Sequence, residues 1–267
     1  LSGLSENMEA SIQLFEKLLQ GPIASQEALN KLVGRIIKSR SDAKKNKNII
    51  LRNQLYAYGK YGEVNPASNN LNTKDLEDLS VEDLTDLIKN LSNYPHRILY
   101  YGKMNHNSLS HMVKTYHKIP ESFSEIINIE NYKEKIYDQE YIFWTHFDMV
   151  QTEIILLSKL ELLDNAKTAA IRLFNQYFGA GMNSIVFQEI REAQGLAYSV
   201  YSTFSQANKP DRSDYLYSYI GIQSDKQSEA LSSMFSLINN LPESQQAFEI
   251  SKKAILNKIE SERITKS

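Results

Sequence analysis

Arg191 and Tyr198 are the two side chains of this sequence whose types and spacing best suit chemistry on a polar ligand. A phenol O–H is a neutral donor that stabilises a developing oxyanion, and a guanidinium can hold a carbonyl oxygen. A helix is expected to end near Arg191 and a strand to begin near Tyr198, so one tight turn brings the two groups close together. Composition alone favours a structural interpretation, in which Arg191 pairs with Glu192 or Glu189 and Tyr198 packs in a sheet.

The stretch Phe178–Phe204 contains the loop, helix and strand that must position this pair. Gly179 and Gly181 form the loop; they follow a helix and lack a third glycine, which excludes a dinucleotide-binding loop. Asn183 or Ser184 is expected to cap the helix by accepting a hydrogen bond, and Gly195 to end it in the left-handed conformation. Alternation along the strand predicts one face with Leu196, Tyr198, Val200 and Phe204, and another with Ala197, Ser199, Tyr201 and Thr203.

The run GMNSIVFQEIREAQGLAYSVYS resembles the signature of the pitrilysin and insulin-degrading (inverzincin) family of zinc metallopeptidases, which includes mitochondrial processing peptidase. With Val186 where leucine is usual, the matching residues are Gly181, Ser184, Phe187, Arg191, Glu192, Gly195, Leu196, Tyr198 and Ser199. In that family the pattern lies in the non-metal, C-terminal part, and its arginine and tyrosine reach the bound peptide near the zinc. The resemblance implies that Arg191 and Tyr198 bind substrate, supported by Gly179, Gly181, Ser184 and Gly195.

Zinc peptidases of this family carry His-x-x-Glu-His on a helix, where two histidines one turn apart hold the metal. This sequence has five histidines, and none has another three or four residues away: His96, His106, His111, His117 and His146. They are interpreted as surface or singly bonded histidines. We therefore expect no catalytic residue, metal site or cofactor in this chain. The resemblance places the zinc in a catalytic half, upstream in the same chain or in a separate subunit.

Composition describes an ordinary globular chain of 267 residues, long enough for roughly two domains. The formal net charge of -2 argues against nucleic acid or an anionic membrane as a partner held by bulk charge. The absence of cysteine excludes disulfides and thiolate metal sites. No transmembrane run or signal peptide is recognisable, so a soluble protein of unknown compartment is expected. The start without methionine suggests a piece of a longer protein.

Apolar spacing predicts an α+β fold with mostly antiparallel sheets flanked by helices. Helices are expected at residues 5–20, 25–38, 44–58, 80–91, 108–116, 165–178, 224–240 and 242–266. Strands are expected at residues 96–101, 141–147, 152–160, 196–204 and 215–222. The aromatic clusters Phe143/Trp144/Phe147 and Tyr215/Tyr217/Tyr219 are interpreted as core and sheet packing.

An internal repeat is predicted between the first two and the last two helices. Ser25-Gln26-x-Ala28 recurs as Ser244-Gln245-x-Ala247, 219 residues later, and apolar positions match in the same register. The chain is therefore expected to contain two consecutive partial copies of a repeated domain. Residues 1–120 would be the later part of one domain, 121–137 a linker, and 138–267 the first part of the next, with the Arg-Tyr motif.

Together these features predict the non-metal portion of a zinc metalloendopeptidase that degrades or processes unfolded peptides. The chain would contribute substrate binding and oxyanion contacts and would be inactive alone. The alternative is a non-catalytic relative that acts as a structural or peptide-binding subunit. Expected partners are a peptide substrate and a zinc-binding half, and unpaired sheet edges make self-association a further expectation.

Overall fold

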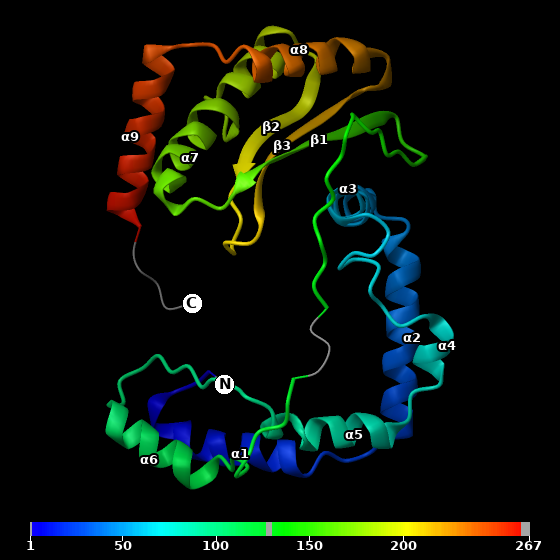
Figure 1. Cartoon of the computed structure of the whole chain (residues 1–267), viewed down its shortest axis with the longest axis vertical. Helices are drawn as coiled ribbons and strands as arrows, with labels where there is room; N and C mark the ends of the chain where they lie inside the picture. The colour runs from blue at the N-terminus through cyan, green and yellow to red at the C-terminus, as the bar shows by residue number, and fades with distance from the viewer. Residues whose placement is uncertain (1, 127–129, 263–267) are drawn as a thin grey trace. The chain divides into compact units, whose positions relative to one another are not determined.

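The computed structural model describes residues 2–126 and 130–262, which divide into two compact units (Figure 1). One unit contains residues 2–45, 70–126 and 130–131, and the other contains residues 46–69 and 132–262. The second unit therefore includes a segment, residues 46–69, that interrupts the first unit in the sequence.

The described part of the first unit is built from helices. They are η1 (Ser5–Asn7), α1 (Met8–Gln20), α2 (Gln26–Ala43), α4 (Thr73–Glu77), α5 (Val81–Lys89), η3 (Leu91–Asn93) and α6 (His106–Tyr116). The polar side chains before α2, α4, α5 and α6 accept a hydrogen bond from a first-turn amide, as helix N-caps do. A small core of Leu29, Val33, Leu76 and Val81 joins α2 to α4 and α5.

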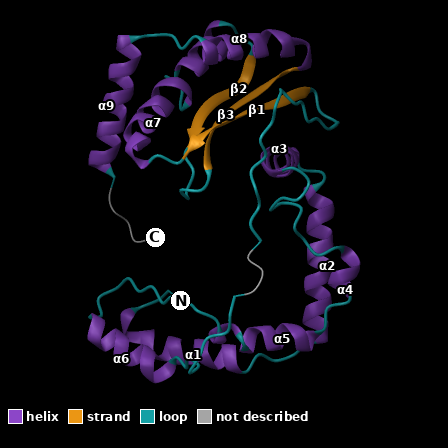
Figure 2. Ribbon diagram, in the orientation of Figure 1, coloured by secondary structure: helices purple, strands orange, loops and turns teal. Residues whose placement is uncertain are grey.

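The second unit is organised on one antiparallel sheet of three strands in the order β1-β3-β2 (Figure 2). The strands are β1 (Gln151–Leu162), β2 (Ala197–Ser205) and β3 (Ser213–Gln223). Ile220 of the central strand lies opposite Ile154 on one side and Val200 on the other. This register places alternating apolar residues of all three strands on one face.

Helices from residues 165–261 pack on that apolar face. They are η4 (Asn165–Lys167), α7 (Thr168–Phe174), η5 (Asn175–Gly179), η6 (Phe187–Ala193), η7 (Ser224–Lys226), α8 (Gln227–Asn239) and α9 (Gln245–Ser261), with η5 and η6 being π-helical. Phe178, Val186, Ile190 and Met234 are almost fully buried against Ile220. This cluster is the main core of the unit and fixes the helix that precedes β2.

The opposite face carries the tyrosines of β3 and is covered by residues 46–61. The π-helical turn η2 (Ile49–Leu55) continues into α3 (Tyr56–Tyr61). Tyr56 contacts Tyr217 edge to face, with ring centroids 5.7 Å apart. Tyr215 and Tyr219 are buried, so the packing interpretation of the tyrosine cluster is correct. The same interpretation is wrong for Trp144 of the other aromatic cluster, which is 80% exposed because its segment joins no strand of the described sheet.

The α+β fold and its antiparallel sheet are confirmed, but two expected strands do not form. Residues 96–101 and 141–147 belong to no strand of the described chain. A strand exists only where a neighbouring backbone completes its hydrogen-bond ladder, and the register of the sheet pairs neither segment. The end of the last predicted helix, residues 263–266, lies outside the described residues.

The helices at the two ends of the chain begin at corresponding positions in the sequence. Three elements near the C-terminus begin 219 residues after three elements near the N-terminus. The pairs of first residues are Ser5 of η1 and Ser224 of η7, Met8 of α1 and Gln227 of α8, and Gln26 of α2 and Gln245 of α9. The capping serines also have nearly the same backbone angles, φ -141° and ψ 104° at Ser25 and φ -137° and ψ 105° at Ser244. The repeat stays a prediction, and this correspondence supports it.

Candidate functional site

Arg191 and Tyr198 lie at the two ends of one tight turn in the second unit. Arg191 is in the last turn of η6, and Tyr198 is the second residue of β2. Gly195 has φ +61°, and its amide donates to the Arg191 carbonyl at 3.1 Å, which closes the end of the helix. The predicted role of Gly195 as the helix stop agrees with this geometry because a left-handed residue is least strained as glycine.

The loop before η6 depends on close packing of small residues. A Cβ on Gly179 would lie 1.9 Å from the Ser202 carbonyl oxygen, so only glycine allows this approach to β2. Gly181 has φ +94°. Ser184 is fully buried, and its hydroxyl donates to the Gly181 carbonyl at 2.8 Å. Ser184 therefore ties the loop together as a donor, whereas the sequence suggested a cap that accepts.

Tyr198 is the extra residue of a β-bulge. Ala197 pairs with Ile222 and Ser199 with Gly221, so one step along β3 corresponds to two along β2. As a result Ala197 and Val200 are both buried in the same core, although strict alternation put them on opposite faces. The face assigned to Ala197 was wrong because a bulge reverses alternation at one point. Bulges often lie beside functional sites, where they redirect a side chain.

The Tyr198 side chain is exposed and hydrogen-bonded at its tip. It retains 51% of its accessible surface. The side-chain amide of Gln223, Nε2, donates to the Tyr198 hydroxyl oxygen at 2.7 Å. The structural interpretation required Tyr198 to pack within the sheet, and it does not. Its phenol is accessible from solvent.

Arg191 is also half exposed and lightly held. Its side chain retains 45% of its surface, and its guanidinium carbon lies 4.7 Å from the centre of the Phe187 ring. Arg191 Nε is 3.8 Å from a Glu192 carboxylate oxygen, which is a weak, solvent-screened ion pair. Among the described residues, no hydrogen bond joins Arg191 to Tyr198 directly. The turn supplies two separate polar groups, each accessible from solvent.

Cations over aromatic rings form the contact between residues 46–61 and the tyrosine face, a feature that the sequence did not reveal. The Arg52 guanidinium lies 4.4 Å from the Tyr219 ring centre and donates to the Tyr201 hydroxyl. The Lys60 ammonium lies 4.3 Å from the Tyr215 ring centre. Burial raises the pKa of both Tyr215 and Tyr219 above the ordinary tyrosine value, because it disfavours the charged phenolate.

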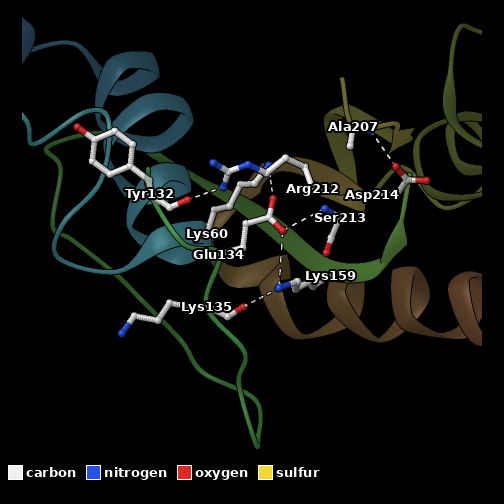
Figure 3. A network of polar contacts seen from close by, with 9 residues as sticks. All are labelled: Lys60, Tyr132, Glu134, Lys135, Lys159, Ala207, Arg212, Ser213 and Asp214. Carbon is white, nitrogen blue, oxygen red and sulfur yellow. Dashed lines mark hydrogen bonds and ion pairs between the residues drawn. The ribbon is translucent and has the colours of Figure 1, made fainter. Parts of the chain in front are cut away.

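A buried carboxylate, Glu134, connects this covering segment to the end of the sheet. The carboxylate accepts a hydrogen bond from the Ser213 amide at 3.1 Å, and the same oxygen lies 3.7 Å from Lys159 Nζ. Figure 3 shows these contacts as dashed lines. Lys60 approaches the other carboxylate oxygen at 3.4 Å. Burial opposes ionisation of Glu134, but the Ser213 hydrogen bonds and the two lysines outweigh it and lower the pKa of the carboxyl.

Two histidines of the first unit lie together, although they are 21 residues apart. His96 Nε2 and His117 Nε2 are 2.7 Å apart, and His117 Nδ1 is 2.7 Å from Glu16 Oε1. The expectation that every histidine would be superficial or singly bonded is wrong for His117, because contacts between distant segments are not visible in local spacing. Within the described residues, no group of three or more histidine, cysteine, aspartate or glutamate side chains is arranged to hold a metal.

No helix in the part of the chain that the structure describes combines the length and apolar character that crossing a bilayer requires.

Comparison with known proteins links this fold to peptidases. A family model described as "Peptidase M16 inactive domain" matches residues 78–255. No match was found among curated proteins. A solved protease from Helicobacter pylori is 16% identical, with a TM-score of 0.66 over 96% of this chain and 64% of that one.

Two further solved structures give the same result for the fold. A peptidase M16 inactive domain from Pseudomonas fluorescens is 17% identical, with a TM-score of 0.59, 94% of this chain covered and 61% of that one. The periplasmic protease PqqL from Escherichia coli is 12% identical, with a TM-score of 0.68, 96% of this chain covered and 28% of that one. The chain thus spans less than two thirds of the length of these proteins.

Proposed function

Because the chain belongs to the peptidase M16 family, as that family's inactive domain, we propose that it is the substrate-gripping, non-metal portion of a zinc endopeptidase that acts on unfolded peptides. Arg191 and Tyr198 are the residues that contact the peptide in this proposal. The observation that carries it is the accessible pair at the η6–β2 turn, held by two positive-φ glycines and a β-bulge.

The chemical roles follow from the two side chains. The Tyr198 O–H donates to a peptide carbonyl oxygen and donates more strongly as that oxygen gains negative charge. Arg191 holds a neighbouring carbonyl of the same peptide with its guanidinium. Neither side chain is consumed or changed in charge, so both act by binding and orienting the substrate.

Zinc belongs to a different part of the proposed enzyme. The described residues offer no cluster of three metal-ligating side chains, so they do not fit a catalytic zinc ion. The zinc-binding half is supplied upstream in a longer chain or by a separate subunit, and it would provide the activated water. Self-association is a further proposal, because β1 and β2 are both outer strands of the sheet.

The first test measures peptide binding by this chain. Fluorescence anisotropy with fluorescein-labelled casein, an unfolded protein, should give a Kd that rises roughly three- to tenfold in Tyr198→Phe, the effect of losing one hydrogen bond. Arg191→Gln should weaken binding by a similar factor. Tyr141→Phe is the matched control because Tyr141 is equally exposed, at 48%, and should leave the Kd unchanged.

The same test separates the proposal from its alternatives. Equal affinities for Tyr198→Phe, Arg191→Gln and the unaltered chain would remove the pair from substrate binding. Zinc content and casein cleavage should be absent from this chain and present when the zinc-binding half is included. A complete protein without zinc or cleavage would identify a non-catalytic, peptide-binding relative.

A further inference from the structure

We propose that Gln223 is a positioning residue for Tyr198: it occupies the phenol oxygen as a donor and so leaves the phenol hydrogen for the bound peptide. This inference rests on the proposed function and adds a residue to it. Gln223 lies outside the motif that contains Arg191 and Tyr198, and it is the last residue of a different strand, β3.

The direction of the hydrogen bond decides what Tyr198 can offer. Gln223 Nε2 carries two hydrogens and no lone pair, so at 2.7 Å it donates to the phenol oxygen. The Tyr198 hydroxyl hydrogen is not used in this bond. A hydroxyl that accepts one hydrogen bond also becomes a better donor, because bonds in a chain polarise one another. The phenol is therefore prepared to donate to a carbonyl oxygen of a peptide.

The backbone at Gln223 is fixed by its contacts with the start of β1. In the sheet register Gln223 pairs with Gln151 at the start of β1. The hydroxyl of the next residue, Ser224, lies 2.9 Å from the Thr152 hydroxyl and donates to the Val150 carbonyl at 3.3 Å. These contacts hold the end of β3 in place, so the Gln223 amide is presented from a rigid element.

Tyr198 needs such a partner because the sheet itself does not direct it. As the extra residue of the bulge, Tyr198 has no pairing residue on β3. Its ring is half exposed and therefore lacks the close packing that fixes a buried rotamer. The hydrogen bond from Gln223 is the contact that orients the tip of the ring.

The proposal is tested by reversing the hydrogen bond in Gln223→Glu. The introduced carboxylate accepts and cannot donate, so it takes up the Tyr198 hydroxyl hydrogen. Binding of fluorescein-labelled casein at pH 7 should weaken three- to tenfold, as in Tyr198→Phe. The double variant Gln223→Glu/Tyr198→Phe should be no weaker than either single variant, because both remove the same donor. Gln227→Glu, which places the same charge at the start of α8 and not opposite Gln223, should bind like the unaltered chain.

A pH profile distinguishes positioning from a merely structural effect. Lowering the pH toward the ordinary glutamate pKa, about 4.3, protonates the introduced carboxylate and restores an O–H donor to the phenol oxygen. The affinity of Gln223→Glu relative to the unaltered chain should therefore recover between pH 7 and about pH 4.5. Far-UV circular dichroism at each pH verifies that both proteins are folded.

The outcomes separate the two proposals. If Tyr198→Phe weakens binding and Gln223→Glu does not, the role of Gln223 is overturned while the proposed function stands. A deficit in Gln223→Glu that is independent of pH, or that Gln227→Glu shares, also overturns it. If Tyr198→Phe itself has no effect, the proposed role of Tyr198 in peptide binding is contradicted, and the role of Gln223 is contradicted with it.

Discussion

Gly179 illustrates how tightly the site is fitted at the level of single atoms. Its backbone lies against the Ser202 carbonyl of β2, and a Cβ there would approach that oxygen to 1.9 Å. The clash is with backbone, so no rotamer change relieves it, and the loop or the strand must move. Because Gly179 has no Cβ, the loop that leads to Arg191 can pack directly against β2, the strand that contains Tyr198. This close packing fixes the loop and the strand relative to each other.

We expect Gly179→Ala to lower the free energy of unfolding by about 3 kcal/mol, the upper range for inserting atoms into a packed interior. Urea denaturation followed by circular dichroism measures this value. The matched control is Gly34→Ala, in the middle of α2 with no atom within 4 Å of the added Cβ. That change should stabilise the chain by up to about 1 kcal/mol. Similar values for the two variants would contradict the packing account.

At the scale of secondary-structure elements, the Glu134 network attaches the chain after residue 131 to α3 and to the sheet. The Lys135 amide donates to the Lys60 carbonyl at 2.9 Å, and Arg212 donates to the Tyr132 carbonyl. Glu134 adds charge to these backbone contacts. Because its pKa is lowered in the folded chain, the carboxylate stabilises the fold at neutral pH and loses that contribution as the pH falls through the lowered pKa.

The unfolding free energies of the native chain and of Glu134→Gln should therefore differ most at pH 7. The difference should stay constant down to the ordinary glutamate pKa, about 4.3, and shrink below it. Urea denaturation at pH 7, 5 and 3 checks this trend. Glu161→Gln is the control, because the Glu161 side chain, on strand β1, is 82% exposed and its replacement should cause little difference at any pH. A difference that persists unchanged at pH 3 would contradict the electrostatic explanation.

Local pattern predicted the elements well and their pairing poorly. Alternation located β1, β2 and β3, and glycine chemistry located the turn at Gly195, because both depend on neighbours in the sequence. The bulge at Tyr198 depends on the register with β3, and the bond from Gln223 depends on that register too. Residues 141–147 have the composition of a strand but pair with no neighbouring strand of the described chain, so no strand forms there. Such features arise between segments, so one segment does not reveal them.

At the scale of the whole molecule, the second unit is discontinuous in sequence. A fragment of residues 132–262 alone would lack residues 46–69 and would expose the tyrosine face of its sheet. We expect a synthetic peptide of residues 46–69, when added to this fragment, to raise its unfolding temperature. The peptide should bind the folded fragment and not the unfolded one, so it shifts the folding equilibrium toward the folded state by mass action. Thermal unfolding at increasing peptide concentration measures the shift.

A peptide with Arg52→Ala and Tyr56→Ala is the control for this experiment. It lacks the guanidinium over the Tyr219 ring and the edge contact with Tyr217, so it should stabilise the fragment less. Equal stabilisation by both peptides would mean that the Arg52 and Tyr56 contacts do not hold the segment on the sheet.

The interrupted order of the second unit also has a consequence in time. A ribosome that has finished residue 69 must add about 150 more residues before β3 is complete, which takes roughly 10–30 s at ordinary rates of synthesis. During that interval Tyr56 and Arg52 have no tyrosine face to cover, while the helices of the first unit are already being made on either side of them. The nascent chain therefore contains an amphipathic segment without its binding surface while the neighbouring helices form. The second unit can complete its folding only after β3 has been synthesised.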